Sequence, residues 1–432
     1  MSTETLLVEL GTEELPPKAL LNLGNAFADG IRQGLEEHRL AFSVVRSLAS
    51  PRRLAVIVED LQTVAEDEAV EVFGPPADRA RAEDGSWLPA AEGFARKHGV
   101  SPDELEVADT PKGQRLAFRS TVAGASAESA IPEVLAQTIK DLPIPKRMRW
   151  GASRAEFVRP VHWLVILLGD KVIDCELLEL KAGRETRGHR FHHPDSVSLA
   201  HSGDYEQCLE SAKVLADFAT RRERIRQQVT QCASDMGGSA DLDAALLDEV
   251  TALVEWPVAL AGSFEERFLE VPQEALISSM KSHQKYFPVL DDAGNLKPNF
   301  IFVSNIESVD PAQVVDGNER VIRPRLSDAA FFFSSDKQHS LASRVDRLKS
   351  IVFQQKLGTL HDKTERLQRL CAWLAPRLGA DQADAERAAL LCKTDLLTDM
   401  VAEFADLQGV AGRYYAEHDG ETPAVAEAME QQ

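Results

Sequence analysis

The pattern of hydrophobic residues changes near residue 330, and this change restricts the folds open to the chain. Before it, β-branched runs such as FSVVRSL and RRLAVIVED predict short strands between helical segments. Beyond Ser340 we expect no strand, because apolar residues recur at spacings of three and four. These helical stripes are Val345, Leu348, Ile351 and Val352; Leu367, Leu370, Cys371 and Leu374; and Leu390, Leu397, Met400 and Val401. The fold class predicted is therefore α+β, with a mixed α/β part followed by an all-helical domain.

The first sixty residues predict the order β-α-β-β. LLVELG is a short apolar strand, Pro16-Pro17 starts a helix, and Leu20, Leu23, Phe27 and Ile31 share one helical face. The acidic, Gly/Pro-bearing stretch after residue 62 predicts a surface module, and a helix is expected over 127–140. These patterns divide the chain into four predicted regions. They are 1–62, 63–141 with the module and its connecting helix, 142–330, and an incomplete helical domain at 331–432.

The charge and the cysteine content bear on which ligands the chain can bind and which cellular compartment it occupies. Against 48 Lys and Arg stand 69 Asp and Glu, a net charge of −21 that makes any polyanion binding depend on local clusters. The five cysteines form no CxxC pair, which is typical of a reducing compartment. The acidic N-terminus lacks a basic signal-peptide region, and the apolar runs are too short for a bilayer. We therefore predict a cytoplasmic protein without a membrane contact.

The stretch from Leu142 to Trp163 is the clearest local cluster of positive charge. It holds five cations and one acid, Glu156, with aromatic side chains between them. Guanidinium groups pair with phosphate oxygens, and aromatic planes stack on unpaired bases, so the pattern is typical of RNA binding. A basic surface loop beside a buried tryptophan pair is the alternative. The candidate RNA-binding residues here are Lys146, Arg147, Arg149, Trp150 and Arg159.

Three further groups are compatible with the same role. Arg52 and Arg53 follow Pro51 at the start of a predicted strand, and SMKSHQKYFP supplies a second group. In GNERVIRPRLSDA we expect the proline to keep the run extended. For each group alone, a solvated face or an internal ion pair is the alternative. The candidates added are Arg52, Arg53, Lys281, His283, Lys285, Arg320, Arg323 and Arg325.

Catalytic motifs are sparse. The sequence has no phosphate loop of the GxxxxGK[ST] type, no HExxH and no GxSxG. His189, His192 and His193 lie close together, but Gly188 and Pro194 disfavour the helix that metal binding at this spacing needs. The doublet His361-Asp362 is typical of HD-type metal phosphohydrolases, with Asp395 as a later acid. We predict no catalytic residue, no metal site and no cofactor in this chain, with a metal-dependent HD phosphohydrolase of nucleotides or RNA ends as the alternative function.

Several long motifs occur in an order that resembles the β subunit of bacterial glycyl-tRNA synthetase. They include LLVELGTEELPP, SPRRLAVIVEDL, LPIPKRMRWG, TRGHRFHHP, FLEVPQEALISSMKSHQKYFPVL, GNERVIRPRLSDAAFFFSSD and KTDLLTDMVAEFADLQGVAGRYYA. The resemblance implies an α2β2 heterotetramer that joins glycine to tRNA(Gly). ATP and Mg would be used on the α subunit, and the β subunit would bind the tRNA.

The same resemblance implies a B3/B4-like middle region and an HD-like helical domain that has lost its full set of metal ligands. Family members continue beyond residue 432 into an anticodon-binding domain, so we expect this chain to be C-terminally truncated. A scaffold for the α subunit that makes no RNA contact is a third interpretation.

Overall fold

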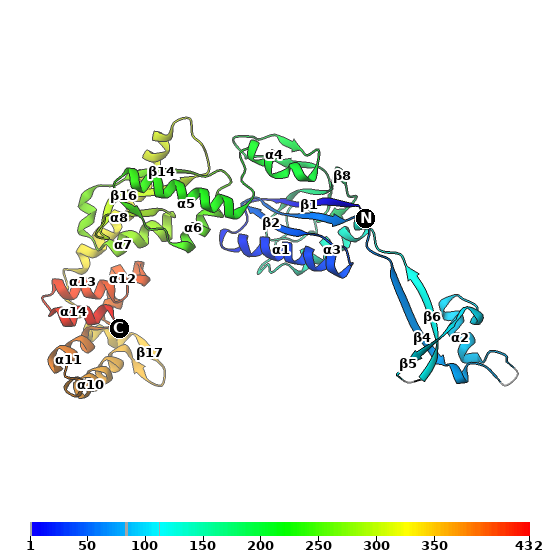
Figure 1. Cartoon of the computed structure of the whole chain (residues 1–432). Helices are drawn as coiled ribbons and strands as arrows, with labels where there is room; N and C mark the ends of the chain where they lie inside the picture. The colour runs from blue at the N-terminus through cyan, green and yellow to red at the C-terminus, as the bar shows by residue number, and fades with distance from the viewer. Residues whose placement is uncertain (1, 83–84, 112) are drawn as a thin grey trace. The chain divides into compact units, whose positions relative to one another are not determined.

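The computed structural model describes residues 2–82, 85–111 and 113–432. It divides into two compact units, Met1–Phe218 and Ala219–Gln432, which we describe separately. Helices and strands are mixed in both units, in agreement with the predicted α+β class (Figure 1). Among the described residues, no helix combines the length and the apolar character that crossing a bilayer requires.

A five-stranded antiparallel sheet forms the centre of the first unit, in the order β2-β3-β1-β7-β8. The predicted β-α-β-β order of the first sixty residues is confirmed. The sheet and the helices beside it comprise β1 (Thr3–Thr12), α1 (Pro17–Glu37), β2 (Val44–Ser50), β3 (Arg53–Gln62), α3 (Ala127–Asp141), β7 (Val161–Leu168), β8 (Lys171–Val172) and α4 (Tyr205–Ser211).

Helices α1 and α3 pack against each other, and α1 also covers β2 and β3 (Figure 1). The predicted apolar face of α1 is buried, with Leu20, Leu23 and Phe27 fully inaccessible. Two glycines let the helices approach closely. A Cβ atom on Gly30 would lie 2.6 Å from Thr138 Cγ2, and one on Gly34 would lie 2.5 Å from Val134 Cγ1.

The opposite face of the sheet is covered by the segment that contains α4. Leu7 and Ile57 of the sheet share a buried cluster with Tyr205 and Leu209 of α4. Because both faces are covered, β7 carries a continuous apolar run in place of a polar–apolar alternation.

Strand pairing connects the predicted region 1–62 with the predicted region 142–330. Leu7 of β1 lies opposite Leu167 of β7, although β7 belongs to the region predicted at 142–330. Three short strands, β8, β9 (Glu176–Leu177) and β10 (Leu180–Lys181), follow β7. Leu178 and Glu179 have φ values of +54° and +63°, which places a tight turn between β9 and β10. The short strands β11 (Glu185–Arg187) and β12 (Ser196–Ser198) pair next to it. The four-region division stays a prediction.

In its described residues, the predicted surface module contains a small three-stranded sheet and the helix α2. Its strands have the order β4-β6-β5. Ala91 and Ala95 of the helix pack with Leu105 and Leu116 in a small separate core. The elements are β4 (Glu68–Pro76), α2 (Pro89–His98), β5 (Glu106–Thr110) and β6 (Gly113–Val122).

The second unit is built on a four-stranded sheet in the order β13-β15-β16-β14. On β16, Ile301 faces one core with Ile225 and Val250, whereas Phe300 and Phe302 face another. Strands β15 and β16 form a hairpin, with Gly294 at φ +84° in its connection. The sheet and its neighbouring helices are α5 (Phe218–Asp235), β13 (Ser239–Ala240), α6 (Ala244–Thr251), β14 (Val258–Ser263), α7 (Gln273–Ser278), β15 (Phe287–Leu290), β16 (Leu296–Ser304) and α8 (Pro311–Asp336).

The core behind Phe300 continues into the C-terminal helices. Ile322 and Leu326 of α8 pack in one cluster with Leu391, Met400 and Met429. Helix α8 also runs through residue 330, where the sequence pattern placed a boundary. The helices that follow are α9 (Leu341–Arg344), α10 (Leu360–Leu378), α11 (Gln382–Leu391), α12 (Asp399–Glu403), α13 (Val410–His418) and α14 (Pro423–Glu430).

Two expectations about the C-terminal region are wrong. Strands do occur after Ser340, because β17 (Val352–Gln354) and β18 (Gly358–Thr359) form a small hairpin. The first predicted stripe is therefore not one helix: a 3-10 turn holds Val345 and Leu348 and ends at Ser350, and Val352 is exposed on β17.

Candidate nucleic-acid interface

The basic stretch that follows α3 folds as an irregular loop. Residues 142–160 are all described, and their only regular pairing is an isolated bridge between Met148 and Phe157. The bridge brings Arg149 beside Glu156, whose carboxylate accepts a hydrogen bond from the Arg149 Nε at 2.6 Å. Trp150 is half-buried at the turn that follows. Arg149 is therefore neutralised within the loop.

Arg147 and Lys146 differ in their surroundings although they are adjacent. The guanidinium of Arg147 donates to the carbonyls of Ile139 and Lys140 at 3.1 and 2.8 Å, the last turn of α3. Cations at this position satisfy the free carbonyls of a helix C-terminus, so Arg147 has a structural role. Lys146 is exposed, and within the described chain it has no hydrogen-bond or ion-pair partner.

Arg159 and His162 contact Glu13 and Glu14, the two residues that directly follow β1. The Arg159 Nε donates to the carbonyl of Glu14 at 3.1 Å, and His162 Nε2 lies 3.0 Å from a carboxylate oxygen of Glu13. Arg190, from the His-rich loop, reaches the carboxylates of Glu13 and Glu14 at 2.9 and 3.3 Å. The hydrogen bond from Arg190 lowers the pKa of the Glu13 carboxyl, and His162 acts in the same direction. Three sequence-distant motifs therefore meet in one charge-balanced network.

Arg52 and Arg53 are buried, which contradicts the expectation that they present charge to a ligand. Arg53 is completely inaccessible, lies 3.0 Å from Glu9, and donates to the carbonyl of Arg187 at 2.9 Å. Arg52 is 8% exposed and donates to the carbonyl of Gly188 at 2.9 Å. A buried guanidinium needs a counter-ion and acceptors, and these contacts supply them. Both residues hold the first unit together.

In the second unit the SMKSHQKYFP motif begins with one turn of π-helix, Ser279–Gln284, and ends on β15. Lys281 Nζ lies 2.5 Å from Asp241, and Lys285 Nζ lies 3.1 Å from Glu249. His283 is exposed, with its ring centroid 6.2 Å from that of Phe404. Both lysines of this group are thus neutralised by acids from other elements.

The arginines of GNERVIRPRLSDA lie on α8, so the expectation of an extended run is wrong. The helix continues through Pro324, because its ends and its buried face are fixed by the core described above. Arg320 pairs with Asp316 at 2.5 Å, and Arg323 pairs with Glu265 at 2.8 Å. Arg325 is exposed and, in the described part of the chain, has no hydrogen-bond or ion-pair partner.

The predicted RNA-binding residues therefore differ in whether their side chains can contact a ligand. Within the first unit, Lys146 is free to meet an anion, and Arg149 and Arg159 are accessible in part. Within the second unit, Arg325 is free, and His283 is exposed. The two sets lie in different units, and each set is considered alone.

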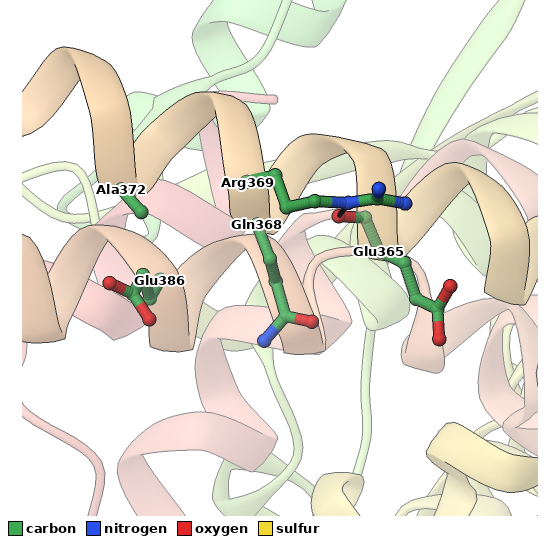
Figure 2. A pocket seen from close by; sticks show the side chains of 5 residues that line it. All are labelled: Glu365, Gln368, Arg369, Ala372 and Glu386. Atoms are coloured by element: carbon green, nitrogen blue, oxygen red, sulfur yellow. Dashed lines mark hydrogen bonds between the residues drawn. The ribbon is translucent and has the colours of Figure 1, made fainter.

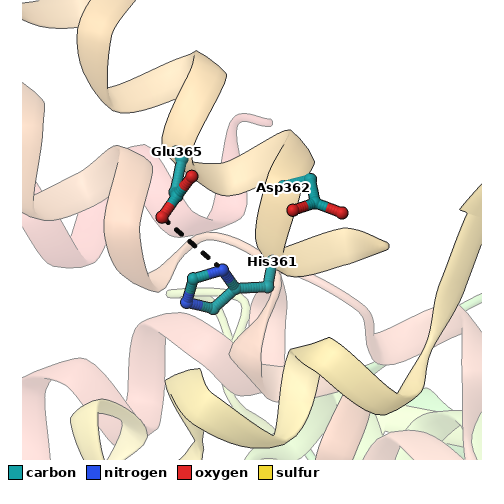
Figure 3. Close-up of side chains that lie close together, drawn as sticks. All are labelled: His361, Asp362 and Glu365. Carbon is teal, nitrogen blue, oxygen red and sulfur yellow. Dashed lines mark ion pairs between the residues drawn. The ribbon is translucent and has the colours of Figure 1, made fainter. Parts of the chain in front are cut away.

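The His361-Asp362 doublet lies at the start of α10. His361 Nδ1 is 3.8 Å from Glu365 (Figure 3). One potential metal-ligand atom from each of His361, Asp362 and Glu365 lies within 4.8 Å of the other two. Asp362, however, accepts hydrogen bonds from the backbone N–H and the hydroxyl of Thr359 at 2.7 and 2.9 Å. This is a capping box, and it accounts for the acid at this position without a metal.

Asp395, the later acid of the predicted HD pattern, is not in this cluster. Its carboxylate is buried and accepts from the N–H of Gly409 at 2.6 Å.

A cavity of about 500 Å³ opens between α10 and α11 (Figure 2). Two carboxylates and one guanidinium line it, so its charge does not favour a polyanion. The lining residues are Glu365, Gln368, Arg369, Ala372 and Glu386.

The chain is similar to known proteins along its whole length. A family model described as glycyl-tRNA synthetase beta subunit matches residues 6–432. Over 432 residues the chain is 54% identical to the glycine–tRNA ligase beta subunit of Stutzerimonas stutzeri (strain A1501), and over 433 residues 54% identical to that of Hahella chejuensis (strain KCTC 2396). The beta subunit of Marinobacter nauticus (strain ATCC 700491 / DSM 11845 / VT8) is 53% identical over 434 residues.

Each of these alignments covers all of this chain, and the chain spans 63% of the length of each relative. Because the family model matches all but the first five residues, this chain belongs to the glycyl-tRNA synthetase beta subunit family.

Proposed function

We propose that the chain acts as part of the β subunit of a glycine–tRNA ligase and binds tRNA(Gly). The observation that carries the proposal is the match to the family over residues 6–432, with relatives whose printed name is glycine–tRNA ligase beta subunit. The chain has no recognised nucleotide-binding loop, which supports a binding role in place of catalysis.

The partner in this proposal is a separate α subunit that carries the active site. ATP and Mg are used there, and the assembly is an α2β2 heterotetramer in the cytoplasm. Reconstitution tests this part. We expect the chain alone to attach no glycine to tRNA(Gly) and glycylation to appear when the α subunit is added. Activity without the α subunit would contradict the assignment of the active site to the α subunit.

Binding to tRNA is tested most sharply at Lys146. A contact to a phosphate releases a counterion, so its loss reduces the slope of log K against log salt by about 0.9. We expect Lys146→Glu to weaken binding and to reduce this slope. Lys18→Glu is the matched control, because Lys18 is also exposed, lies on α1 of the same unit and undergoes the same change of charge.

Equal slopes and affinities for the two variants would remove Lys146 from the interface. Arg147 is unsuitable for this test, because its substitution would also disturb the end of α3. Binding of the unmodified chain that is indifferent to salt would contradict a phosphate-based interface as a whole.

The alternative function, an HD-type phosphohydrolase, is supported only by the cluster of His361, Asp362 and Glu365. It predicts one divalent transition metal per chain that is lost in His361→Ala. Metal analysis of the purified protein and of the variant decides between the two functions. The third interpretation, a scaffold without RNA contact, predicts no crosslink to tRNA in the presence or absence of the α subunit.

A further inference from the structure

The loop at 189–193 has a fixed conformation and an exposed aromatic tip. Phe191 is 68% exposed, whereas His189, two residues before it, is completely inaccessible. His189 Nδ1 accepts the backbone N–H groups of Phe191 and His192, each at 3.2 Å. An acceptor ring nitrogen at this position turns the loop back on itself, and the ring centroids of His189 and Phe191 lie 6.2 Å apart.

Backbone hydrogen bonds, one to Ala212 and one within the loop, hold its two ends. The N–H of His189 donates to the carbonyl of Ala212 at 2.9 Å, and that of His193 donates to the carbonyl of His189 at 2.9 Å. Arg52 binds the carbonyl of Gly188. A Cβ atom on Gly188 would lie 2.8 Å from both Ala212 Cβ and His193 Cβ, so this position is closely packed. The phenyl ring is therefore presented by a rigid loop.

We propose that Phe191 is a stacking platform for an unpaired base of the bound RNA. Exposing a phenyl ring to water on a braced loop forfeits the burial that its apolar surface would gain elsewhere in the fold. Stacking on a base recovers that burial and places no demand on the base sequence, because every base has a π-face. This inference rests on the proposed tRNA-binding function.

The surroundings favour a base over a phosphate or a protein partner. Arg190 beside the ring is already bound to Glu13 and Glu14, so the site has little free positive charge for a phosphate. The residues adjacent to Phe191 in the loop are Arg190 and His192, which are polar. Protein interfaces bury contiguous apolar cores, whereas a single aromatic ring among polar groups matches one planar base.

The test compares Phe191→Ala with Phe191→Trp in tRNA(Gly) binding, measured by fluorescence anisotropy over a series of salt concentrations. Removal of one stacking ring lowers affinity by about five- to 150-fold, and Phe191→Ala should fall in this range. Phe191→Trp should retain the affinity. The salt slope should be the same in all three proteins, because no phosphate contact changes.

The unmodified chain and Phe191→Ala together distinguish failure of this inference from failure of the proposed function. If the unmodified chain binds tRNA and Phe191→Ala binds equally well, Phe191 is not a stacking residue, whereas the proposed function stands. If Phe191→Ala lowers both affinity and salt slope, the ring acts near a phosphate and the stacking assignment is wrong. If the unmodified chain does not bind tRNA, both proposals fail. Thermal unfolding of Phe191→Ala should match that of the unmodified chain, since the side chain is exposed.

Discussion

At the scale of single residues, the charged groups that hold the fold differ from those available to a ligand. Arg53 and Glu9 form an ion pair with both side chains fully buried, whereas the pair of Arg46 and Glu206 is about 37% and 38% exposed. When one member of a buried pair is removed, the remaining charge lies in a medium that solvates it poorly. When one member of an exposed pair is removed, water solvates the remaining charge. Loss of the buried ion pair should therefore lower the free energy of unfolding more than loss of the exposed one.

We expect Arg53→Met to lower the free energy of unfolding by about 3–5 kcal/mol, because Glu9 is left buried without its partner. Arg46→Met, the matched control, should cost at most about 1 kcal/mol. Urea denaturation followed by circular dichroism measures both. The double variant Arg53→Met/Glu9→Leu should recover much of the loss, and equal costs for the two single variants would contradict the buried-charge argument.

Asp395 gives a pH dependence of unusual sign. Burial raises the pKa of its carboxyl above the ordinary value of 3.8, despite the hydrogen bond from Gly409. A folded-state pKa above the unfolded-state value means that folding favours the protonated form. The stability that this group contributes is fully present below pH 3.8 and is lost as the pH rises through the raised pKa.

Asp395→Asn should therefore raise the free energy of unfolding at pH 7, because the amide keeps an acceptor for Gly409 without the desolvated charge. The advantage should shrink as the pH falls below 3.8. Denaturation curves of both proteins between pH 3 and 7 provide the measurement. A variant that is less stable at pH 7 would show that the ionised carboxylate is favourable at this site.

At the scale of elements, local patterns predicted the strands and helices with clear boundaries. The helix that starts at Pro16-Pro17 and the strand that follows Pro51 both combine a proline signal with an apolar pattern. The pattern was misleading where tertiary packing overrides local preference. Proline disfavours a helix interior, yet α8 contains Pro324 because Ile322 and Leu326 are buried in the surrounding core.

Pro324→Ala should stabilise the second unit. Proline is about 3 kcal/mol less favourable than alanine inside a helix, because it has no N–H for the carbonyl four residues earlier. We expect a gain on the order of 1–3 kcal/mol in the free energy of unfolding. Pro311→Ala is the control, since proline is tolerated at the first turn of α8 and the change should be within about 0.5 kcal/mol. A loss of stability in Pro324→Ala would indicate that the core requires a proline-induced bend.

Helix α10 shows why an apolar stripe does not establish burial. The predicted face of Leu367, Leu370, Cys371 and Leu374 does lie on a helix, but Leu370 is 50% exposed and Trp373, beside it, is 55% exposed. Leu360, Thr364 and Ala375 are the buried residues of this helix. Periodicity identifies which residues share a face, and only the tertiary packing determines what covers that face.

At the scale of the whole molecule, the sequence located the basic groups but not their partners. Lys281, Lys285 and Arg323 were recognised by their proximity in sequence, whereas Asp241, Glu249 and Glu265 come from other elements. For the same reason the sequence did not single out Phe191. The conformation of its loop depends on Arg52 and Ala212, which lie far from it along the chain.

The positions of the cores lead to a final prediction. The cluster around Leu7 contains residues of the first unit, from Leu7 to Ala216, and the cluster around Leu326 contains residues of the second, from Phe264 to Met429. Leu7→Ala and Leu326→Ala each remove a fully buried leucine side chain and should cost about 2–5 kcal/mol. Hydrogen exchange measured by mass spectrometry reports where stability is lost. Leu7→Ala should accelerate exchange in β1, β3 and β7 but not in β16, and Leu326→Ala should do the reverse; equal acceleration in both sheets would show that the chain unfolds as a single cooperative domain.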